Sequence, residues 1–344
     1  MHLKKSLLIA LILGIAAVTS WELYWRSKGY QPGLEETKDL WAVQREKVEN
    51  SGKKDVLLLG DSRLLFDIQL NDWERETGIR PIQLATPGTT PLPAFHDIVK
   101  NTEYSGNIVI SVTPIVFFST TNPHAEFWHR IQSRVDYYQK RTLANQLNHF
   151  LDIPLQQNLA FLANDEELWT DDLDLKTLLR NIQIGDRLEG MKMPPFYRFQ
   201  EIEIDRNLKM TERTVTDTSF ANTVKSVWGF YGQRAGSGPP PDKESVLSFF
   251  LSDLSEFKSR GGNVILVRCP SSGLLREVES KMMPRTEFYD ILVEAADVPA
   301  YHFEDYEQLN QFECPEWSHL SAQDASTFST ELARILIKDQ VINN

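Results

Sequence analysis

The chain has 344 residues, of which 41% are hydrophobic and 24% charged, and this is enough to bury the core of one large domain. Its formal net charge of −12 argues against a nucleic-acid partner, because surfaces that bind nucleic acids are basic. Short basic pairs such as Lys53-Lys54 do not change that balance and are typical of solvated turns.

Residues 1–28 differ in kind from the rest. Lys4-Lys5 precede an apolar run from Leu7 to Val18, and several aromatic residues continue it as far as Trp25. About 20 apolar residues are needed to cross a bilayer, so we expect an uncleaved signal anchor here. A cleaved signal peptide is the alternative, but Ala17–Ser20 match the small-residue cleavage pattern poorly and bulky Trp21 follows them.

The charge flanking this segment predicts its orientation. Lys4-Lys5 before the span favour a cytoplasmic N-terminus, since basic flanks stay on the cytoplasmic side. We therefore expect residues 29–344 to form a membrane-anchored domain on the extracytoplasmic, periplasmic side.

After the anchor, helical and strand-like segments alternate. A helix is expected over Glu35–Val48, and short apolar runs indicate buried strands. The expected strands are Val56–Leu59, Pro81–Ala85, Asn107–Val112, Asn263–Val267 and Ala300–Phe303. Further helices are expected from Ser62 through Trp73 and over Ala94–Lys100, Ser245–Arg260 and Ser321–Ile337. The alternation predicts an α/β domain: a three-layer α/β/α fold around a short parallel sheet.

The alternation stops between about residues 117 and 228. This stretch is mostly polar and helical in pattern, with charge-rich turns at Asn164–Glu167 and Asp171–Asp174 and an interruption at Pro194-Pro195. We interpret it as a helical insertion that caps one end of the sheet. The segment Gly236–Pro241 that follows is expected to be a loop.

The first candidate for chemistry is Ser62. It follows the first buried strand in the tripeptide Gly60-Asp61-Ser62, and it would lie at a helix N-terminus on the edge of the sheet where ligands bind. Unpaired N–H groups at a helix N-terminus favour negative charge, which suits a serine nucleophile and an oxyanion. A turn that only caps a helix is the simpler alternative.

A base for that serine is present near the C-terminus. His319 stands in the loop that enters the last expected helix, and Glu316 lies three residues before it. An acid at this spacing can orient the imidazole from the same loop. The other histidines considered, His124, His129 and His302, are expected to be packing or surface residues, and His124 and His129 lack metal-site spacing.

The blocks Val56–Ser62 and Glu316–His319, with Gly88 after the second strand, resemble the SGNH (GDSL-like) hydrolase superfamily. The resemblance implies a flavodoxin-like sheet, no metal or cofactor, and an oxyanion hole made by the Ser62 and Gly88 amides. The asparagine that the family carries after its third strand is absent, and Thr113 is the candidate donor there. The acid is Glu316 where the family has aspartate.

The chain combines a membrane anchor, a helical insertion and the loss of the asparagine after the third strand. In these three features it resembles membrane-anchored SGNH-like proteins that work beside membrane O-acyltransferases. The resemblance implies an esterase or O-acyltransferase acting on an extracytoplasmic acylated polysaccharide or lipid. The alternative that it leaves open is a non-catalytic partner of a membrane O-acyltransferase complex.

Two cysteines, Cys269 and Cys314, are both expected near the carboxyl edge of the sheet. In an oxidising compartment they could form a disulfide that restrains the loop carrying His319. The alternative is two buried thiols that pack as small hydrophobic groups.

Overall fold

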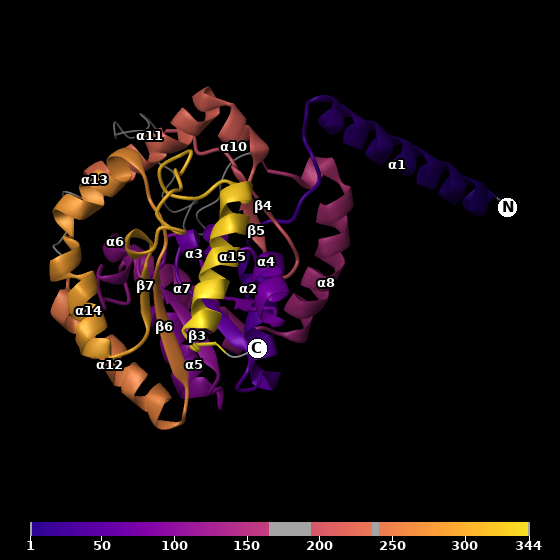
Figure 1. The fold of residues 1–344 in the computed structure, drawn as a ribbon. Helices are drawn as coiled ribbons and strands as arrows, with labels where there is room; N and C mark the ends of the chain where they lie inside the picture. Colours follow the sequence, from indigo (N-terminus) through magenta and orange to yellow (C-terminus); the bar gives the residue numbers. More distant parts are fainter. Residues whose placement is uncertain (1, 165–193, 236–240, 343–344) are drawn as a thin grey trace, which may run out of the picture.

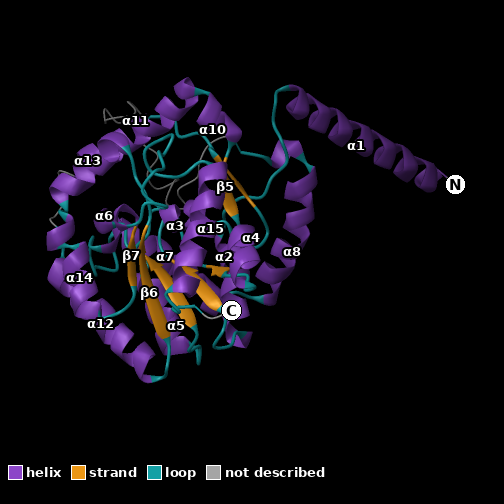
Figure 2. Ribbon diagram, in the orientation of Figure 1, coloured by secondary structure: helices purple, strands orange, loops and turns teal. Residues whose placement is uncertain are grey.

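A parallel sheet of five strands forms the centre of the computed structural model, which describes residues 2–164, 194–235 and 241–342 (Figures 1 and 2). The strand order is β2-β1-β3-β6-β7, and all neighbouring pairs are parallel. The strands are β1 Val56–Leu59, β2 Ile82–Gln83, β3 Asn107–Ser111, β6 Asn263–Arg268 and β7 Ala300–His302. All five were predicted, and the chain order 2-1-3-4-5 along the sheet is the flavodoxin-like one.

The three central strands, β1, β3 and β6, are buried on both faces, as their continuous apolar runs predict. In β1, Val56 and Leu58 enter one hydrophobic core, whereas Leu57 and Leu59 enter the other. Helices cover both cores, so the α/β prediction of three layers is confirmed.

The helices divide between the two faces. Those contributing to the first core are α3 Ser62–Asp67, α4 Leu70–Thr77, α11 Thr218–Ala235 and α15 Ala322–Lys338. Those contributing to the second are α5 Leu92–Asn101, α7 Glu126–Lys140, α12 Lys243–Ser259 and α14 Tyr289–Ala296. Helix α2, Lys38–Lys47, contributes Leu40 to the first and Trp41 to the second. Helix α6, Pro114–Phe117, adds Phe117 to the second core. The remaining helices are α1 His2–Ser27, α8 Leu143–Asn158, α10 Glu212–Thr216 and α13 Gly273–Met282.

The helix expected through Trp73 is interrupted. It ends at Asp67, and extended residues Ile68 and Gln69 separate α3 from α4. Tertiary hydrogen bonds hold the break: the Gln69 amide N–H donates to Ser329 Oγ at 2.7 Å, and its side chain donates to the Leu208 carbonyl at 2.7 Å. Contacts of this kind override local helix propensity.

The insertion differs from the prediction in two ways. Helix α7 packs against α2 and α5 over a face of the sheet, so the insertion does not only cap one end. It also contains an antiparallel pair, β4 Gln200–Ile202 and β5 Leu208–Met210. Residues 165–193 lie outside the described residues, and with them all of the expected turn Asp171–Asp174 and most of Asn164–Glu167. Residues 236–240, which make up most of the loop expected at Gly236–Pro241, lie outside them as well.

Arg206 explains why the β4–β5 turn is fixed to the sheet. This residue has a left-handed backbone, φ 66°, and is fully buried. Its guanidinium donates to the carbonyls of Gln83 and Ala85, each at 2.8 Å, and pairs with Glu36. Glu36 also forms a two-pronged ion pair with Arg134 of α7, with both contacts at 2.6 Å. One buried carboxylate therefore ties two parts of the insertion to the edge strand.

Helix α1 projects away from the domain (Figure 1). Within the described part of the chain, Leu3–Ser27 is one helix long and apolar enough to cross a membrane, and the domain buries none of its apolar window. A helix of this kind agrees with the expected anchor segment.

The two cysteines do not form the disulfide that one of the two sequence interpretations predicted. Cys269 and Cys314 are buried free thiols in the first core. The Cys314 amide N–H donates to Ser272 Oγ at 2.9 Å, which fixes this part of the loop without a covalent bridge. Burial raises the pKa of both thiols well above the ordinary value, so they behave as packing residues.

Candidate active site

Ser62 lies where the sheet reverses its strand order. Strand β1 lies between β2 and β3, and the carboxyl ends of such strands form the edge at which ligands bind in open α/β sheets. Gly60 is required at this turn, because a Cβ there would come within 2.5 Å of the Ser111 Cβ. The next residue, Asp61, accepts a hydrogen bond from Ser111 Oγ at 3.0 Å. Half-buried Ser62 then begins helix α3.

Glu316 and His319 form the predicted pair, and both side chains are completely buried. Glu316 Oε1 accepts the His319 Nδ1–H at 2.8 Å and the His319 backbone N–H at 2.6 Å. The other oxygen, Oε2, accepts the indole N–H of Trp228 from α11. Because a carboxylate only accepts hydrogen bonds, this arrangement puts the imidazole proton on Nδ1 and leaves Nε2 with a free lone pair.

The imidazole ring is held by aromatic side chains. Phe66 stacks on His319 with ring centroids 4.2 Å apart, and Phe199 and Trp228 lie at 5.8 Å and 6.0 Å. Phe66 is one helical turn after Ser62, and helical side chains lean toward the preceding turn. The ring that covers the imidazole therefore shares a face of α3 with the serine. Within the described residues, the buried His319 Nε2 has no hydrogen-bond partner.

Helix α3 also contacts the residues on both sides of His319. Arg63 Nε donates to Ser318 Oγ at 3.4 Å, and the Leu320 amide N–H donates to Asp67 Oδ1 at 3.0 Å. Asp67 is fully buried, and this burial raises the pKa of its carboxyl well above the ordinary value. The helix that begins at Ser62 thus fixes the position of the histidine loop.

The loop itself is strained at Trp317, between the acid and the histidine. Trp317 has φ 81°, a left-handed conformation that costs a bulky residue on the order of 1–3 kcal/mol. Its carbonyl accepts the Ser272 N–H at 2.9 Å, and its ring lies over Gly273, where a Cβ would come within 2.5 Å of the indole. Strain of this kind clusters at functional sites, where surrounding contacts hold the backbone in place.

Besides the Ser62 amide, the predicted oxyanion donors are Gly88 and Thr113, which follow the strands on either side of β1. Gly88 follows β2 in a left-handed conformation, φ 62°, and the Thr86 N–H two residues earlier donates to the Gly60 carbonyl at 2.9 Å. Thr113 follows β3 and is buried, and its Oγ1 has no hydrogen-bond partner among the described residues. An unpaired buried hydroxyl is uncommon, so a group to which Thr113 can donate is expected at this edge.

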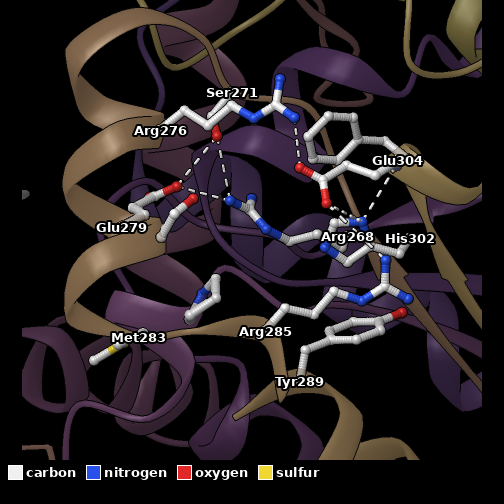
Figure 3. Close-up of a pocket in the computed structure, with 12 residues that line it drawn as sticks. Arg268, Ser271, Arg276, Glu279, Met283, Arg285, Tyr289, His302 and Glu304 are labelled. Atoms are coloured by element: carbon white, nitrogen blue, oxygen red, sulfur yellow. Dashed lines mark hydrogen bonds and ion pairs between the residues drawn. The ribbon is translucent and has the colours of Figure 1, made fainter. Parts of the chain in front are cut away.

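A small pocket of about 50 Å³ adjoins this edge at the ends of β6 and β7 (Figure 3). Glu279 links it to the site: its carboxylate pairs with Arg63 at 2.6 Å and with Arg268 at 2.7 Å. Burial acts to raise the pKa of Glu279, but the two guanidiniums lower it below its ordinary value. The pocket's other arginines, Arg276 and Arg285, are paired with acids as well.

His302 lines this pocket and is a packing residue, as predicted. Its ring lies beside Tyr289 and Phe303, and its Nδ1 accepts the Glu304 N–H at 3.2 Å. Burial, together with nearby arginines, lowers the pKa of His302 to about 3, so the ring is neutral at physiological pH. Across the described residues, no group of three or more His, Cys, Asp or Glu side chains is placed to hold a metal ion.

Sequence reasoning missed three aromatic contributors to the site. Phe66 could have been found, because its spacing of four from Ser62 places both on one helical face. Phe199 and Trp228 come from the insertion and reach His319 only through the tertiary fold. Comparison of the chain with protein-family models, with curated proteins and with solved structures gives no match in any of the three.

Proposed function

We propose that this protein is a serine-dependent esterase or O-acyltransferase. The observation that carries the proposal is that the helix beginning at Ser62, α3, also holds the histidine loop in place. Phe66 of this helix stacks on the His319 ring, and Asp67 accepts a hydrogen bond from the Leu320 amide N–H. In the proposal, the His319 Nε2 lone pair, which has no hydrogen-bond partner among the described residues, accepts the proton of the half-buried Ser62 hydroxyl. These are the roles of base and nucleophile in a serine–histidine–acid triad.

In the proposed reaction, Ser62 Oγ attacks the ester carbonyl while His319 Nε2 takes its proton. Glu316 stabilises the imidazolium through Nδ1–H. The Ser62 and Gly88 amides and the Thr113 hydroxyl donate to the oxyanion of the tetrahedral intermediate. His319 returns the proton to the leaving alkoxide, and an acyl-serine forms. Water or an acceptor hydroxyl then attacks that ester, with His319 again taking and returning a proton.

The membrane anchor defines the setting of the proposal. With Lys4-Lys5 in the cytoplasm, the domain lies outside it, where its substrate is an acylated polysaccharide or lipid. A membrane O-acyltransferase is the expected partner, supplying or receiving the acyl group.

Turnover of generic acetyl esters, with and without a sugar acceptor, tests the proposal. Ser62→Ala should reduce turnover by several orders of magnitude, as at other serine–histidine sites, without unfolding the domain. Transfer is distinguished from hydrolysis by acetylated sugar appearing in place of free acetate. Turnover within about threefold of wild type in folded Ser62→Ala protein would remove Ser62 as the nucleophile.

A second candidate is a non-catalytic partner of such an acyltransferase. Two observations favour it: Thr113 stands where the resembled family has an asparagine, and the His319 side chain is completely buried. It predicts that no acetyl ester is turned over by the wild type, while the folded chain still binds the membrane complex.

A further inference from the structure

Helix α8 exposes its apolar side. Five large apolar side chains of this helix have between 48% and 80% of their surface exposed: Leu143, Leu147, Phe150, Leu151 and Leu155. Their spacing of 4, 3, 1 and 4 places them on one face of the helix. None of the residues of α8 is buried. A continuous exposed apolar stripe marks a surface that meets another apolar phase.

The opposite side of α8 faces the protein; it is mostly polar, and its Ile153 packs against the first core. The Gln156 carbonyl accepts the Gly33 N–H, and its side-chain oxygen accepts the Glu35 N–H, both at 3.1 Å. Asp152 lies on the same side and accepts a hydrogen bond from the Gln156 amide. Turning the helix to hide its leucines would break these contacts, so the fold itself holds the apolar stripe outward.

The end of α8 is tied to the end of α1. Glu22 accepts the Ala160 and Phe161 backbone N–H groups at 2.9 Å and 3.2 Å, and Arg26 donates to the Asn158 carbonyl at 3.0 Å. These bonds join the last turns of the expected membrane span to the residues at which α8 ends. In Figure 1, α8 runs along the side of the domain next to α1 and crosswise to it.

Aromatic residues mark the level of the membrane surface on α1. Trp21, Tyr24 and Trp25 pack against one another with ring centroids 5.6 to 5.8 Å apart, at the same turns as Glu22 and Arg26. Tryptophan and tyrosine concentrate at membrane–water interfaces. The C-terminal end of α8 is therefore held at the level of the headgroups whenever α1 spans the bilayer.

We infer that α8 lies on the bilayer that α1 crosses, with its apolar stripe in the boundary between headgroups and acyl chains. A lipid surface, rather than a protein groove, is the occupant because α1 holds α8 at that surface and across the direction of the span. Helix α8 contains no lysine or arginine, so apolar burial alone should drive its insertion. Together α1 and α8 hold the domain by two elements, which restricts its rotation above the membrane.

Site-directed spin labelling of the full chain tests this inference. The chain is placed as one copy per nanodisc of zwitterionic lipid, with a nitroxide on Leu147→Cys or, separately, Leu151→Cys. Glu277→Cys on exposed α13 is the matched control. Because Cys269 and Cys314 are buried, the unsubstituted chain should take up little label. We expect oxygen to reach the two α8 labels several-fold better, relative to a water-soluble nickel reagent, than it reaches the control.

Equal access of the nickel reagent to all three labels would overturn the inference, and so would α8 labels that become lipid-exposed only with anionic lipid. Protection that appears only with two copies per disc would assign the stripe to a second chain instead. Since both leucines are exposed, neither substitution should change the melting temperature in detergent by more than a few degrees. These outcomes do not depend on Ser62 or on any enzymatic activity.

Discussion

Replacing Glu316 with glutamine separates the two roles of this side chain, which are to orient His319 and to satisfy buried donors. The carboxylate accepts three N–H groups, two from His319 and one from Trp228. Glutamine offers one oxygen. If that oxygen stays on His319, the amide NH2 faces the indole N–H; if it turns, both histidine donors lose their acceptor.

Either outcome leaves at least one donor unpaired, the partly buried Trp228 indole N–H or the fully buried His319 N–H groups, which costs about 1–3 kcal/mol of unfolding free energy. The Glu316→Gln/Trp228→Phe double variant no longer has the indole N–H that would face the glutamine amide. Adding Trp228→Phe to Glu316→Gln should therefore lower the free energy of unfolding by less than Trp228→Phe does in the wild-type chain. We expect a coupling free energy of about 1 kcal/mol or more. Urea unfolding of the four proteins in mild detergent measures it.

The Glu316→Gln and Trp228→Phe variants should also differ in their rates of ester turnover. Glu316→Gln cannot stabilise the imidazolium and should lose about four orders of magnitude, as is typical when a triad acid becomes an amide. Trp228→Phe keeps the carboxylate and should lose far less. Additive unfolding free energies within about 0.5 kcal/mol, with equal losses of turnover, would refute this role for Glu316.

Three further predictions concern charge and topology. Glu36 has a folded pKa of about 2, because Arg134 and Arg206 outweigh the effect of burial, against about 4.3 in an unfolded chain. The lowered pKa of Glu36 adds about 3 kcal/mol to the free energy of unfolding above pH 4.5, and this contribution is lost as the pH falls toward 2. Between pH 5 and pH 2 the free energy of unfolding of the wild type should therefore fall by about 3 kcal/mol more than that of Glu36→Gln. Burial raises the pKa of Asp67 in the folded protein. Its contribution to the free energy of unfolding is therefore fully present below about pH 4 and is lost as the pH rises. Asp67→Asn, which keeps an acceptor for the Leu320 amide, should therefore gain stability over wild type from pH 4 to 7, whereas a constant difference would mean that Asp67 ionises normally. Alkaline-carbonate washing should leave the chain in the membrane pellet, and release of the intact chain would contradict the anchor.

The strands were predictable because two-sided burial leaves a plain signal, as in the four apolar residues Val56–Leu59. The Glu316–His319 pair was predictable because both members lie in one loop, so their contact depends little on the rest of the fold. The break after Asp67 was not, since it depends on hydrogen bonds to Leu208 and Ser329 that come from distant parts of the chain.

The insertion was the least predictable part for a related reason. Its β4–β5 turn is held by the buried guanidinium of Arg206, which sequence patterns treat as a surface residue. The apolar stripe of α8 has the periodicity of a core-facing helix, and only the fold shows that it faces outward. Trp228 likewise reads as one more core aromatic until its indole is seen to bind Glu316.

Covalent labelling tests the central claim most directly. The folded wild-type chain, incubated with a fluorophosphonate, should gain one adduct, and peptide mass spectrometry should place it on Ser62. Ser62→Ala should gain none, and His319→Ala should react far more slowly because its serine has lost the base. A folded wild-type chain that takes up no label at Ser62, or that is labelled equally well in the absence of His319, would contradict the account.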